Sequence, residues 1–476
     1  SCILVMFELK LRNRSIGERN MAVERQRQHE QDPMVRKTNF DAVENNLTDE
    51  QAKLESSRCL NCKNPRCVSG CPVNINIPKF IHEVKEGNIE EAGKTIRESS
   101  MLPSVCGRVC PQERQCEGKC VLGIKGEAVA IGALERYVGD ATKAVETEIK
   151  PSGKKVAIVG SGCAGITAAA DLRKAGHDVT VFEALHELGG VLRYGIPPFR
   201  LPRTVLDREL DSLKNMGVKF ERNVIVGKSI TLKQLEDDGY DAIFICSGAG
   251  LPKMMGITGE NLNGVYSANE FLTRVNLMHA NDEKFPTPLK VGKKVAVIGG
   301  GNVAMDAART ALRAGFEEVH IVYRRTEAEL PARKEEIRHA KEEGVIFDLL
   351  HAPVEILGED GYVKGMKFEK MVLGEPDESG RRKPVGTGEY VVFDVDSVIV
   401  ALGTGPNPII QKSASADDMA FDTDNKGYIV INGDTGETSI PKIYAGGDVA
   451  PTGPSTAINA MGAGKRAAKA INELLK

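Results

Sequence analysis

The chain has no tryptophan, few aromatic residues and no long apolar run. Tryptophan is absent and aromatic residues make up 5% of the 476 residues. The apolar stretch at residues 3–7 is far shorter than the roughly 18 residues that a bilayer crossing needs. It also lacks the basic region and the cleavage pattern of a signal peptide. With a formal net charge of -3, we expect a cytoplasmic globular protein that binds neither a membrane nor nucleic acid.

The length predicts several domains, and composition divides the N-terminal third in two. Residues 1–40 are polar and mixed in charge, which is typical of an arm without its own core, and residues 1–20, before Met21, resemble an extension. Residues 41–150 hold eight of the eleven cysteines. Residues 77–99 place apolar side chains at helical spacing, with Pro78 in a first turn, so this domain is expected to be helical.

The rest of the chain repeats one pattern twice. Residues 154–183 and 293–325 each read as a strand, a glycine turn, a helix and a second strand. The predicted fold class is therefore α/β, with two Rossmann-like doubly wound nucleotide-binding domains. We expect one to be inserted in the other. The first would span residues 151–288 and 405–476, and the second residues 289–404.

The first glycine turn carries the complete dinucleotide fingerprint, with Gly160, Gly162 and Gly165 in the spacing G-x-G-x-x-G. Such glycines bring backbone N–H groups to a pyrophosphate at a helix N-terminus. Glu183, at the end of the second strand, is suited to bind ribose hydroxyls. Further along, Gly190 and Arg193 are also assigned to cofactor binding.

The C-terminal segment IYAGGDVAPTGPSTAINAMGAGKRAA places Gly447 and Asp448 in a turn and starts a small-residue helix near Thr456. A helix N-terminus here would face the ring of a flavin and stabilise its reduced anionic form. The alternative is a turn before a packing helix.

The second fingerprint differs where it selects the nucleotide. Gly299 and Gly301 form the turn, Asn302 follows, and Arg324 and Arg325 end the second strand where an acid would favour NAD(H). Guanidinium groups suit a 2′-phosphate, so we predict NADP(H). The alternative is a pair of arginines in surface salt bridges.

Cysteines are concentrated in two clusters of the helical domain, namely Cys59, Cys62, Cys67 and Cys71, then Cys106, Cys110, Cys116 and Cys120. This density in a cytosolic chain indicates a metal rather than disulfides. Zinc is the rival interpretation. Proline follows Cys71 and Cys110, which is typical of iron–sulfur motifs whose last cysteine binds the other cluster.

Neither nucleotide domain contains a C-x-x-C pair, which argues against a disulfide reductase. Cys163 and Cys246 lie in small-residue positions and are expected to be packing residues. No side chain is assigned a catalytic role, because flavin-mediated hydride transfer needs placement rather than a protein base.

Several longer motifs carry a family resemblance. They are EQDPMVRKTNF, SRCLNCKNPRCVSGCPVNINIPKFI, CGRVCPQERQCEGKC, IGALERY, YGIPPFRLP and AGGDV. From about residue 30 the chain resembles the small subunit of NADPH-dependent glutamate synthase and its relatives. These include the N-terminal part of dihydropyrimidine dehydrogenase and the large subunit of the electron-bifurcating NADH-dependent reduced ferredoxin:NADP oxidoreductase. The resemblance implies FAD, NADP(H) and two [4Fe-4S] clusters.

The resemblance also implies a crossed set of cluster ligands. One cluster would be held by Cys59, Cys62, Cys67 and Cys120, and the other by Cys71, Cys110, Cys116 and Glu135. Cys106 would then be a spare thiol. If Glu135 is an ordinary helix-surface glutamate, Cys106 becomes the substitute ligand.

Two of these relatives imply different partners, and the segments CVSGCPVNINIPKFI and EQDPMVRKTNF favour the bifurcating large subunit. Its partners would be a smaller FAD/[2Fe-2S] flavoprotein subunit and ferredoxin, with NAD as the second nucleotide. The alternative is the small subunit of glutamate synthase, feeding electrons to the large amidotransferase subunit. A scaffold subunit with vestigial nucleotide sites is the third hypothesis, which the complete fingerprints disfavour.

Overall fold

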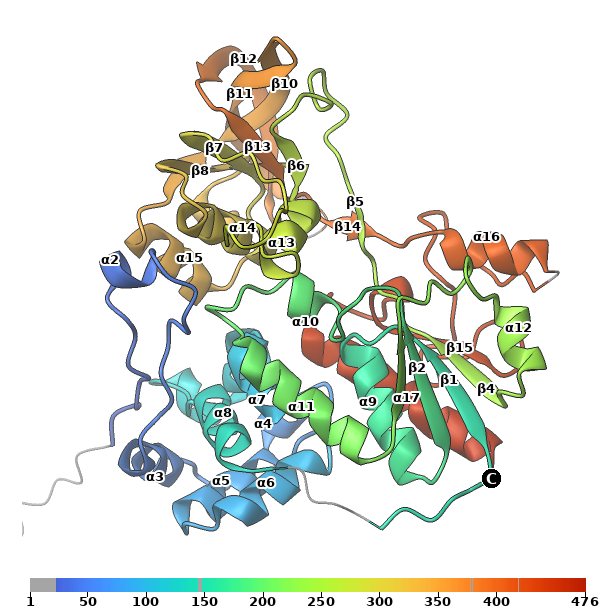
Figure 1. Cartoon of the computed structure of the whole chain (residues 1–476). Helices are drawn as coiled ribbons and strands as arrows, with labels where there is room; N and C mark the ends of the chain where they lie inside the picture. Colours follow the sequence, from blue (N-terminus) through green and yellow to red (C-terminus); the bar gives the residue numbers. More distant parts are fainter. Residues whose placement is uncertain (1–22, 144–147, 377, 379, 418) are drawn as a thin grey trace, which may run out of the picture.

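A computed structural model describes residues 23–143, 148–376, 378, 380–417 and 419–476 (Figure 1). The expectations for residues 1–20 and for the apolar stretch 3–7 lie outside these residues. Within the part that is described, none of the helices combines the length and the apolar character that a bilayer crossing requires.

The cysteine-rich segment folds into a cluster of short helices (Figure 1). The helices are α3 (Asp49–Ser57), α4 (Arg66–Ser69), α5 (Ile77–Lys85), α6 (Ile89–Arg97), α7 (Pro103–Val109) and α8 (Ile131–Ala141), with 3-10 turns η1 (Gln112–Arg114), η2 (Glu117–Lys119) and η3 (Val121–Ile124). Local sequence sets the helix starts: Thr48 and Gln51 form a capping box before α3, and Pro78 lies in the first turn of α5. The predicted helical domain is confirmed.

The first nucleotide domain is a parallel sheet of five strands in the order β15-β4-β1-β2-β3. The strands are β1 (Lys155–Val159), β2 (Asp178–Glu183), β3 (Lys219–Arg222), β4 (Ala242–Ile245) and β15 (Ile443–Ala445). Its helices are α9 (Cys163–Lys174), α10 (Val191–Tyr194), α11 (Arg203–Asn215), α12 (Leu232–Asp237), α16 (Ile409–Ala416) and α17 (Ala457–Leu474). Because β15 pairs with β4, the C-terminal segment completes the sheet that the first segment begins.

The second nucleotide domain has its own five-stranded parallel sheet, in the order β6-β13-β7-β8-β9. Its strands are β6 (Val265–Ser267), β7 (Lys294–Ile298), β8 (Glu318–Tyr323), β9 (Ile346–Leu349) and β13 (Ser397–Val400). Its helices are α13 (Ala268–Asn276), α14 (Asn302–Arg313) and α15 (Lys334–Glu342), with the turn η4 (Glu327–Glu329). An antiparallel sheet of β10 (His351–Glu359), β11 (Tyr362–Pro376) and β12 (Arg382–Phe393) extends from it (Figure 1).

The chain crosses between the two domains at β5 (Leu251–Pro252) and β14 (Thr404–Gly405), which pair with each other. The insertion therefore begins after β5. This differs from the boundary expected at residue 289, because β6 pairs with β13 and α13 packs beside α14. Strand β6 has only three residues and no glycine turn after it, so the sequence gave no signal that this segment belongs to the second nucleotide domain.

Residues 23–47 form an arm that runs from the helical domain to the second nucleotide domain (Figure 1). It carries the short helix α2 (Pro33–Arg36). Arg36 is 1% exposed and pairs with Glu343 at 2.9 Å and Glu342 at 2.6 Å. The Val43 N–H donates to Phe199 O of the first nucleotide domain at 3.0 Å. The arm thus contacts each domain of the molecule.

Candidate functional site: nucleotide sites and two sulfur clusters in series

The first glycine turn leaves the N-terminus of α9 open. Gly160 has φ +115°, and a side chain there would meet Cys246 O at 2.6 Å, so only glycine is suitable. Gly165 packs against the backbone of the same turn, because a Cβ added at Gly165 would lie 2.0 Å from Gly160 O. Gly162 begins α9 without a side-chain cap and borders open space. These unsatisfied N–H groups fit a dinucleotide pyrophosphate.

Glu183 lies beside this turn, as predicted, but its carboxylate is already engaged. One oxygen accepts from Ser161 N at 3.0 Å and from Ser161 Oγ at 2.6 Å, and the other accepts from Leu185 N at 2.8 Å. The side chain is 6% exposed. Glu183 thus fixes the shape of the turn, and its contact with a ribose stays a prediction.

The segment after β2 brings Gly190 to the same turn, whereas Arg193 is occupied elsewhere. Gly190 has φ +54°, and a Cβ there would lie 3.1 Å from Gly162 Cα. Arg193 donates to Leu188 O at 3.0 Å and pairs with Asp207. Its guanidinium holds this segment in place, so a direct cofactor contact stays a prediction.

Tyr194, next to Arg193, was missed by sequence reasoning about the fingerprint. Burial raises the pKa of its hydroxyl to about 12, and the charges of Glu183, Asp448 and Cys163 act in the same direction. The tyrosine therefore lies among the residues of the first nucleotide site. Its place at the start of the motif YGIPPFRLP is the signal that identifies it.

The C-terminal turn η5 (Gly447–Val449) meets the start of α9. Gly447 has φ +72°, and a Cβ there would come within 3.3 Å of Ala164 Cβ. Burial raises the pKa of Asp448, against a hydrogen bond with Ser455 that lowers it. Thr456 caps α17 by accepting from Asn459 N at 3.3 Å. This is the arrangement predicted for the flavin side of the site.

The second glycine turn has the same geometry. Gly299 has φ +145°, and a Cβ there would lie 2.5 Å from Ala401 O. Gly301 begins α14 without a side-chain cap and borders open space. Asn302 Oδ1 accepts from Arg333 N at 2.8 Å, so this side chain anchors the following loop. The N-terminus of α14 fits a second dinucleotide pyrophosphate.

The two arginines predicted to bind a 2′-phosphate have different environments. Arg324 is exposed at the end of β8, whereas Arg325 is 5% exposed and donates to Arg382 O at 2.7 Å. Arg382, from distant strand β12, pairs with Glu329 at 2.8 Å and so brings another cation to this region. Its strand is separated from β8 by 58 residues or more of chain, so local sequence gave no sign of it.

Four cysteines line one cavity near the surface of the helical domain. They are Cys59, Cys62, Cys67 and Cys120, from segments far apart in the sequence. Burial raises the pKa of Cys67 to about 11, and the charges of Cys59 and Cys120 add to this shift. The four thiols therefore converge as the resemblance implied, which fits a [4Fe-4S] cluster held by thiolates.

A second group of ligands is buried deeper and includes Glu135. Burial raises the pKa of Cys116, and the charges of Glu135 and Cys71 act on the same thiol. A hydrogen bond with Cys106 and burial raise the pKa of Cys110, and the charges of Glu135 and Cys116 add to this shift. Glu135 is 6% exposed, burial raises its pKa to about 8, and its Oε1 has no hydrogen-bond partner. The alternative of a helix-surface glutamate is therefore wrong. An orphaned buried carboxylate beside three thiols fits a metal ligand.

Cys106 lies between this second group and the flavin side of the molecule. Its Sγ lies 3.5 Å from Met461 Sδ on α17 and 3.8 Å from Ser100 Oγ. It also interacts with the thiol of Cys110 and, electrostatically, with Cys163 at the start of α9. Cys106 thus interacts both with a thiol of the buried group and with α17 and the start of α9 on the flavin side.

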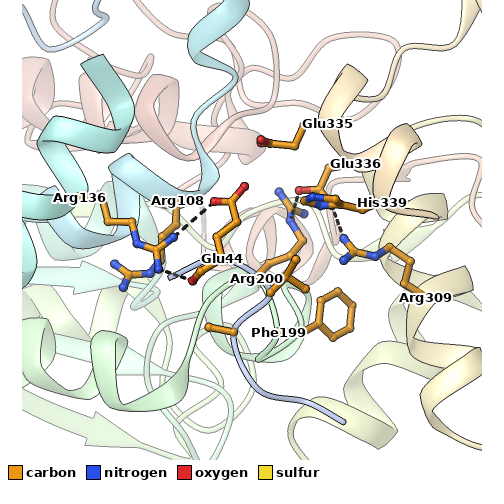
Figure 2. A pocket seen from close by; sticks show the side chains of 11 residues that line it. Glu44, Arg108, Arg136, Phe199, Arg200, Arg309, Glu335, Glu336 and His339 are labelled. Atoms are coloured by element: carbon orange, nitrogen blue, oxygen red, sulfur yellow. Dashed lines mark hydrogen bonds and ion pairs between the residues drawn. The ribbon is translucent and has the colours of Figure 1, made fainter. Parts of the chain in front are cut away.

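A small cavity lies where the arm, the helical domain and both nucleotide domains meet (Figure 2). Its labelled side chains are Glu44, Arg108, Arg136, Phe199, Arg200, Arg309, Glu335, Glu336 and His339. Arg200 pairs with Asp306 at 2.7 Å and Glu336 at 2.8 Å, which joins the two nucleotide domains. Burial, reinforced by the charge of Glu335, raises the pKa of Glu44 to about 8. The cavity is a charged junction that fixes the domains relative to one another.

Comparison with known proteins agrees with this organisation. Residues 36–147 match the family model of the dihydropyrimidine dehydrogenase domain II, 4Fe-4S cluster, and residues 154–464 match that of pyridine nucleotide-disulphide oxidoreductases. The glutamate synthase [NADPH] small chain of Escherichia coli K12 is 37% identical over 93% of this chain and 95% of its own length. The chain belongs to the glutamate synthase small-chain-like family of FAD/iron–sulfur oxidoreductases.

Other relatives are longer. The NADP(+)-dependent formate dehydrogenase subunit beta of Moorella thermoacetica is 39% identical over 86% of this chain, which spans 60% of that relative. Among solved structures, FprA of Mycobacterium tuberculosis in complex with NADPH has a TM-score of 0.55 and 22% identity, covering 68% of this chain and 85% of its own. That likeness shows the fold of the two nucleotide domains.

Proposed function

We propose that this chain exchanges electrons between NADP(H) and a partner protein by way of FAD and two [4Fe-4S] clusters. The observation that carries the proposal is the serial arrangement of the sites. Glycine turns open on two helix N-termini, and the sulfur groups lead from the flavin side to the surface. A nicotinamide transfers two electrons as a hydride, whereas an iron–sulfur cluster transfers one electron at a time. Bound FAD would connect the two, because a flavin can accept a hydride and then donate single electrons.

Each residue group has a defined part in this scheme. The N–H groups after Gly162 and Gly301 bind the pyrophosphates of FAD and NADP(H), respectively, and Arg324 binds the 2′-phosphate. Glu183 holds the flavin turn, while the N-terminus of α17 at Thr456 stabilises negative charge on the ring. Arg200 holds the NADP(H) domain against the flavin domain through its buried ion pair with Asp306, and Arg36 holds the arm against the NADP(H) domain through its pair with Glu343.

We further propose an electron-bifurcating transhydrogenase as the setting, with a smaller FAD/[2Fe-2S] flavoprotein subunit and ferredoxin as partners and NAD as the second nucleotide. A role as the small subunit of glutamate synthase is the second candidate. It is favoured by the match to the Escherichia coli small chain over 95% of that protein's length. Both settings use the same internal electron path.

One measurement tests the proposed electron path, and a second distinguishes the two proposed settings. Anaerobic reduction of the holoprotein by NADPH should bleach the flavin absorbance and generate the EPR signals of reduced clusters. An absence of cluster signals would overturn the electron path. Anaerobic isolation of the native complex, with partner masses determined, then decides the setting: a small flavoprotein supports bifurcation, and a large amidotransferase subunit supports glutamate synthase.

A further inference from the structure

The glycine turn of the second dinucleotide site is bonded to the loop that precedes α15. This loop, residues 330–333, meets the turn at two points. Ala332 N donates to Gly300 O at 3.2 Å, and Arg333 N donates to Asn302 Oδ1 at 2.8 Å. Asn302 is the first residue of α14. The loop is therefore held at the helix N-terminus that would bind the pyrophosphate of NADP(H).

The same loop also contacts η1 of the helical domain. Arg114 donates to Ala332 O at 3.2 Å. The Arg333 guanidinium donates to Gln112 Oε1 at 2.9 Å and to the Glu113 carboxylate at 3.3 Å. Arg333 is 8% exposed, so its side chain is buried between the two domains. Hydrogen bonds from a guanidinium are stronger than neutral ones and hold their partners in a fixed geometry.

The turn η1 lies in the chain between Cys110 and Cys116, two thiols of the buried group. Gln112 fixes the turn in place, because its Nε2 donates to the backbone of α7 at 3.1 Å. Gln112 also packs against α8, where a Cβ added at Gly132 would lie 2.5 Å from its Nε2. Glu135, the carboxylate proposed as a cluster ligand, follows one helical turn later. Gln112 thus contacts both α7 and α8 beside the buried group.

Arg333 is therefore bonded at one end to the nucleotide turn and at the other to the loop of the buried group. A dinucleotide would bring a negative pyrophosphate to one end of this link, and reduction of the cluster adds an electron at the other. Both changes add negative charge on the two sides of the same buried cation, so each should disfavour the other. The effects of two sites on one another are reciprocal.

We propose that Arg333 is a positioning residue that couples occupancy of the NADP(H) site to the redox potential of the buried cluster. The inference rests on the sites and the electron path proposed above, and it adds a thermodynamic link between them. A bound dinucleotide lowers the midpoint potential of the buried cluster, and reduction of that cluster weakens nucleotide binding. Release of NADP⁺ is therefore favoured once this cluster is reduced, which orders the two events.

The test uses the holoenzyme and 2′-phospho-ADP-ribose, which has the pyrophosphate and the 2′-phosphate of NADP⁺ but no nicotinamide. In an anaerobic EPR titration of the wild type, this probe should lower the midpoint potential of the buried cluster. Couplings between sites are typically about fivefold or more. A fivefold loss of affinity on reduction is equivalent to a shift of about 40 mV, because tenfold is about 59 mV for one electron. The potential of the surface cluster, whose ligands η1 does not separate, should stay unchanged.

Three variants at neighbouring positions separate coupling from a merely structural role. Arg333→Met removes the guanidinium, so the shift caused by the probe should be lost. Arg333→Lys keeps the charge but not the fork, and it should retain part of the shift. Lys334→Met makes the same change in net charge at the next residue, which is exposed, and it should keep the wild-type shift. A structural role alone would alter stability or cluster loading and leave a shift of wild-type size.

Iron content shows whether the variants are loaded. If Arg333→Met does not assemble its clusters, Gln112→Met/Glu113→Ala is measured instead, because it removes both η1 contacts while Arg333 keeps its pair with Glu335 at 3.1 Å. Its shift should also be lost. No shift in the wild type, or a shift of wild-type size in the loaded test variant, would overturn the coupling. Failure of the wild type to bind the probe, or of NADPH to reduce its clusters, would instead overturn the proposed function and this inference with it.

Discussion

The Sγ of Cys106 lies 3.5 Å from the Sδ of Met461, across the boundary between the helical domain and the last helix of the flavin domain. Cys106 is 0% exposed, as is Met461. This contact joins the cluster side and the flavin side of the molecule through two polarizable sulfur atoms. The Cys106 thiol also forms a hydrogen bond with the thiol of Cys110.

We predict that Cys106→Ala leaves both clusters in place. With Glu135 as the fourth ligand, as the proposed ligand set has it, the buried cluster does not need Cys106, so iron and sulfide content should equal wild type. The change removes a thiol beside Cys110, and hydrogen bonding to cluster sulfurs is one determinant of potential, so the midpoint potential of this cluster should shift in an EPR titration. Loss of about half of the iron would instead identify Cys106 as a ligand.

Glu135→Ala should perturb one cluster only. The variant deletes the buried carboxylate whose Oε1 has no other partner, so the EPR signal of the Cys71 group should change or disappear while that of the Cys59 group persists. Glu135→Gln, which keeps a coordinating oxygen, should restore much of the signal. Unchanged signals in both variants would contradict the ligand assignment.

The sequence predicted the parts of this site that depend on local patterns. The glycine turns at Gly160 and Gly299, the uncapped helices after them and the cysteine groups follow from short-range spacing. What it missed depends on distant contacts. Arg36 reads as a surface residue of a polar arm, yet it is buried because Glu342 and Glu343 come to it from the second nucleotide domain.

The same limit explains the domain boundary. The strand at residues 294–298, followed by a glycine turn, gives the strongest sequence signal and predicts a start of the second domain just before it, at residue 289. Strand β6 precedes this strand in the chain and lies at the edge of the same sheet, where it pairs with β13. No short-range pattern encodes that pairing, because the partner lies in β13, more than a hundred residues away.

The two arginines at the end of β8 should differ in their effects. Because Arg324 is exposed and Arg325 is buried against Arg382, Arg324→Ala should raise KM for NADPH by about tenfold, equivalent to ~1.4 kcal/mol, with KM for NADH nearly unchanged. Arg325→Ala should chiefly lower the melting temperature. An equal effect of Arg324→Ala on both nucleotides would rule out 2′-phosphate recognition by this residue.

Glu183→Ala should reduce retention of FAD. The substitution removes the carboxylate that is predicted to bind the ribose, and it also leaves Ser161 and Leu185 N without their acceptor, so the turn loses its support. The ratio of flavin absorbance to protein after gel filtration should fall, whereas cluster absorbance should remain. Lys228→Ala, on the same domain, serves as the control. Full occupancy in the Glu183 variant would mean that the first nucleotide site is wrongly assigned.

Glu44 makes the stability of the domain junction depend on pH. Its pKa in the folded protein is raised to about 8 by burial and by the charge of Glu335, from an ordinary value of 4.5. The folded state therefore binds more protons than the unfolded state between these values, and the free energy of unfolding falls as pH rises from about 5 to 8. Melting temperature should decrease over this interval by on the order of a few degrees through this group.

Glu44→Gln removes the titration but keeps the backbone acceptor, since Arg136 donates to Glu44 O at 2.7 Å. Its melting temperature should exceed that of wild type at pH 8 and match it more closely at pH 5. Glu359→Gln, at an exposed site on β10, is the control. If the melting temperatures of the wild type and of Glu44→Gln change with pH in parallel, the Glu44 carboxyl is not the group whose titration destabilises the junction.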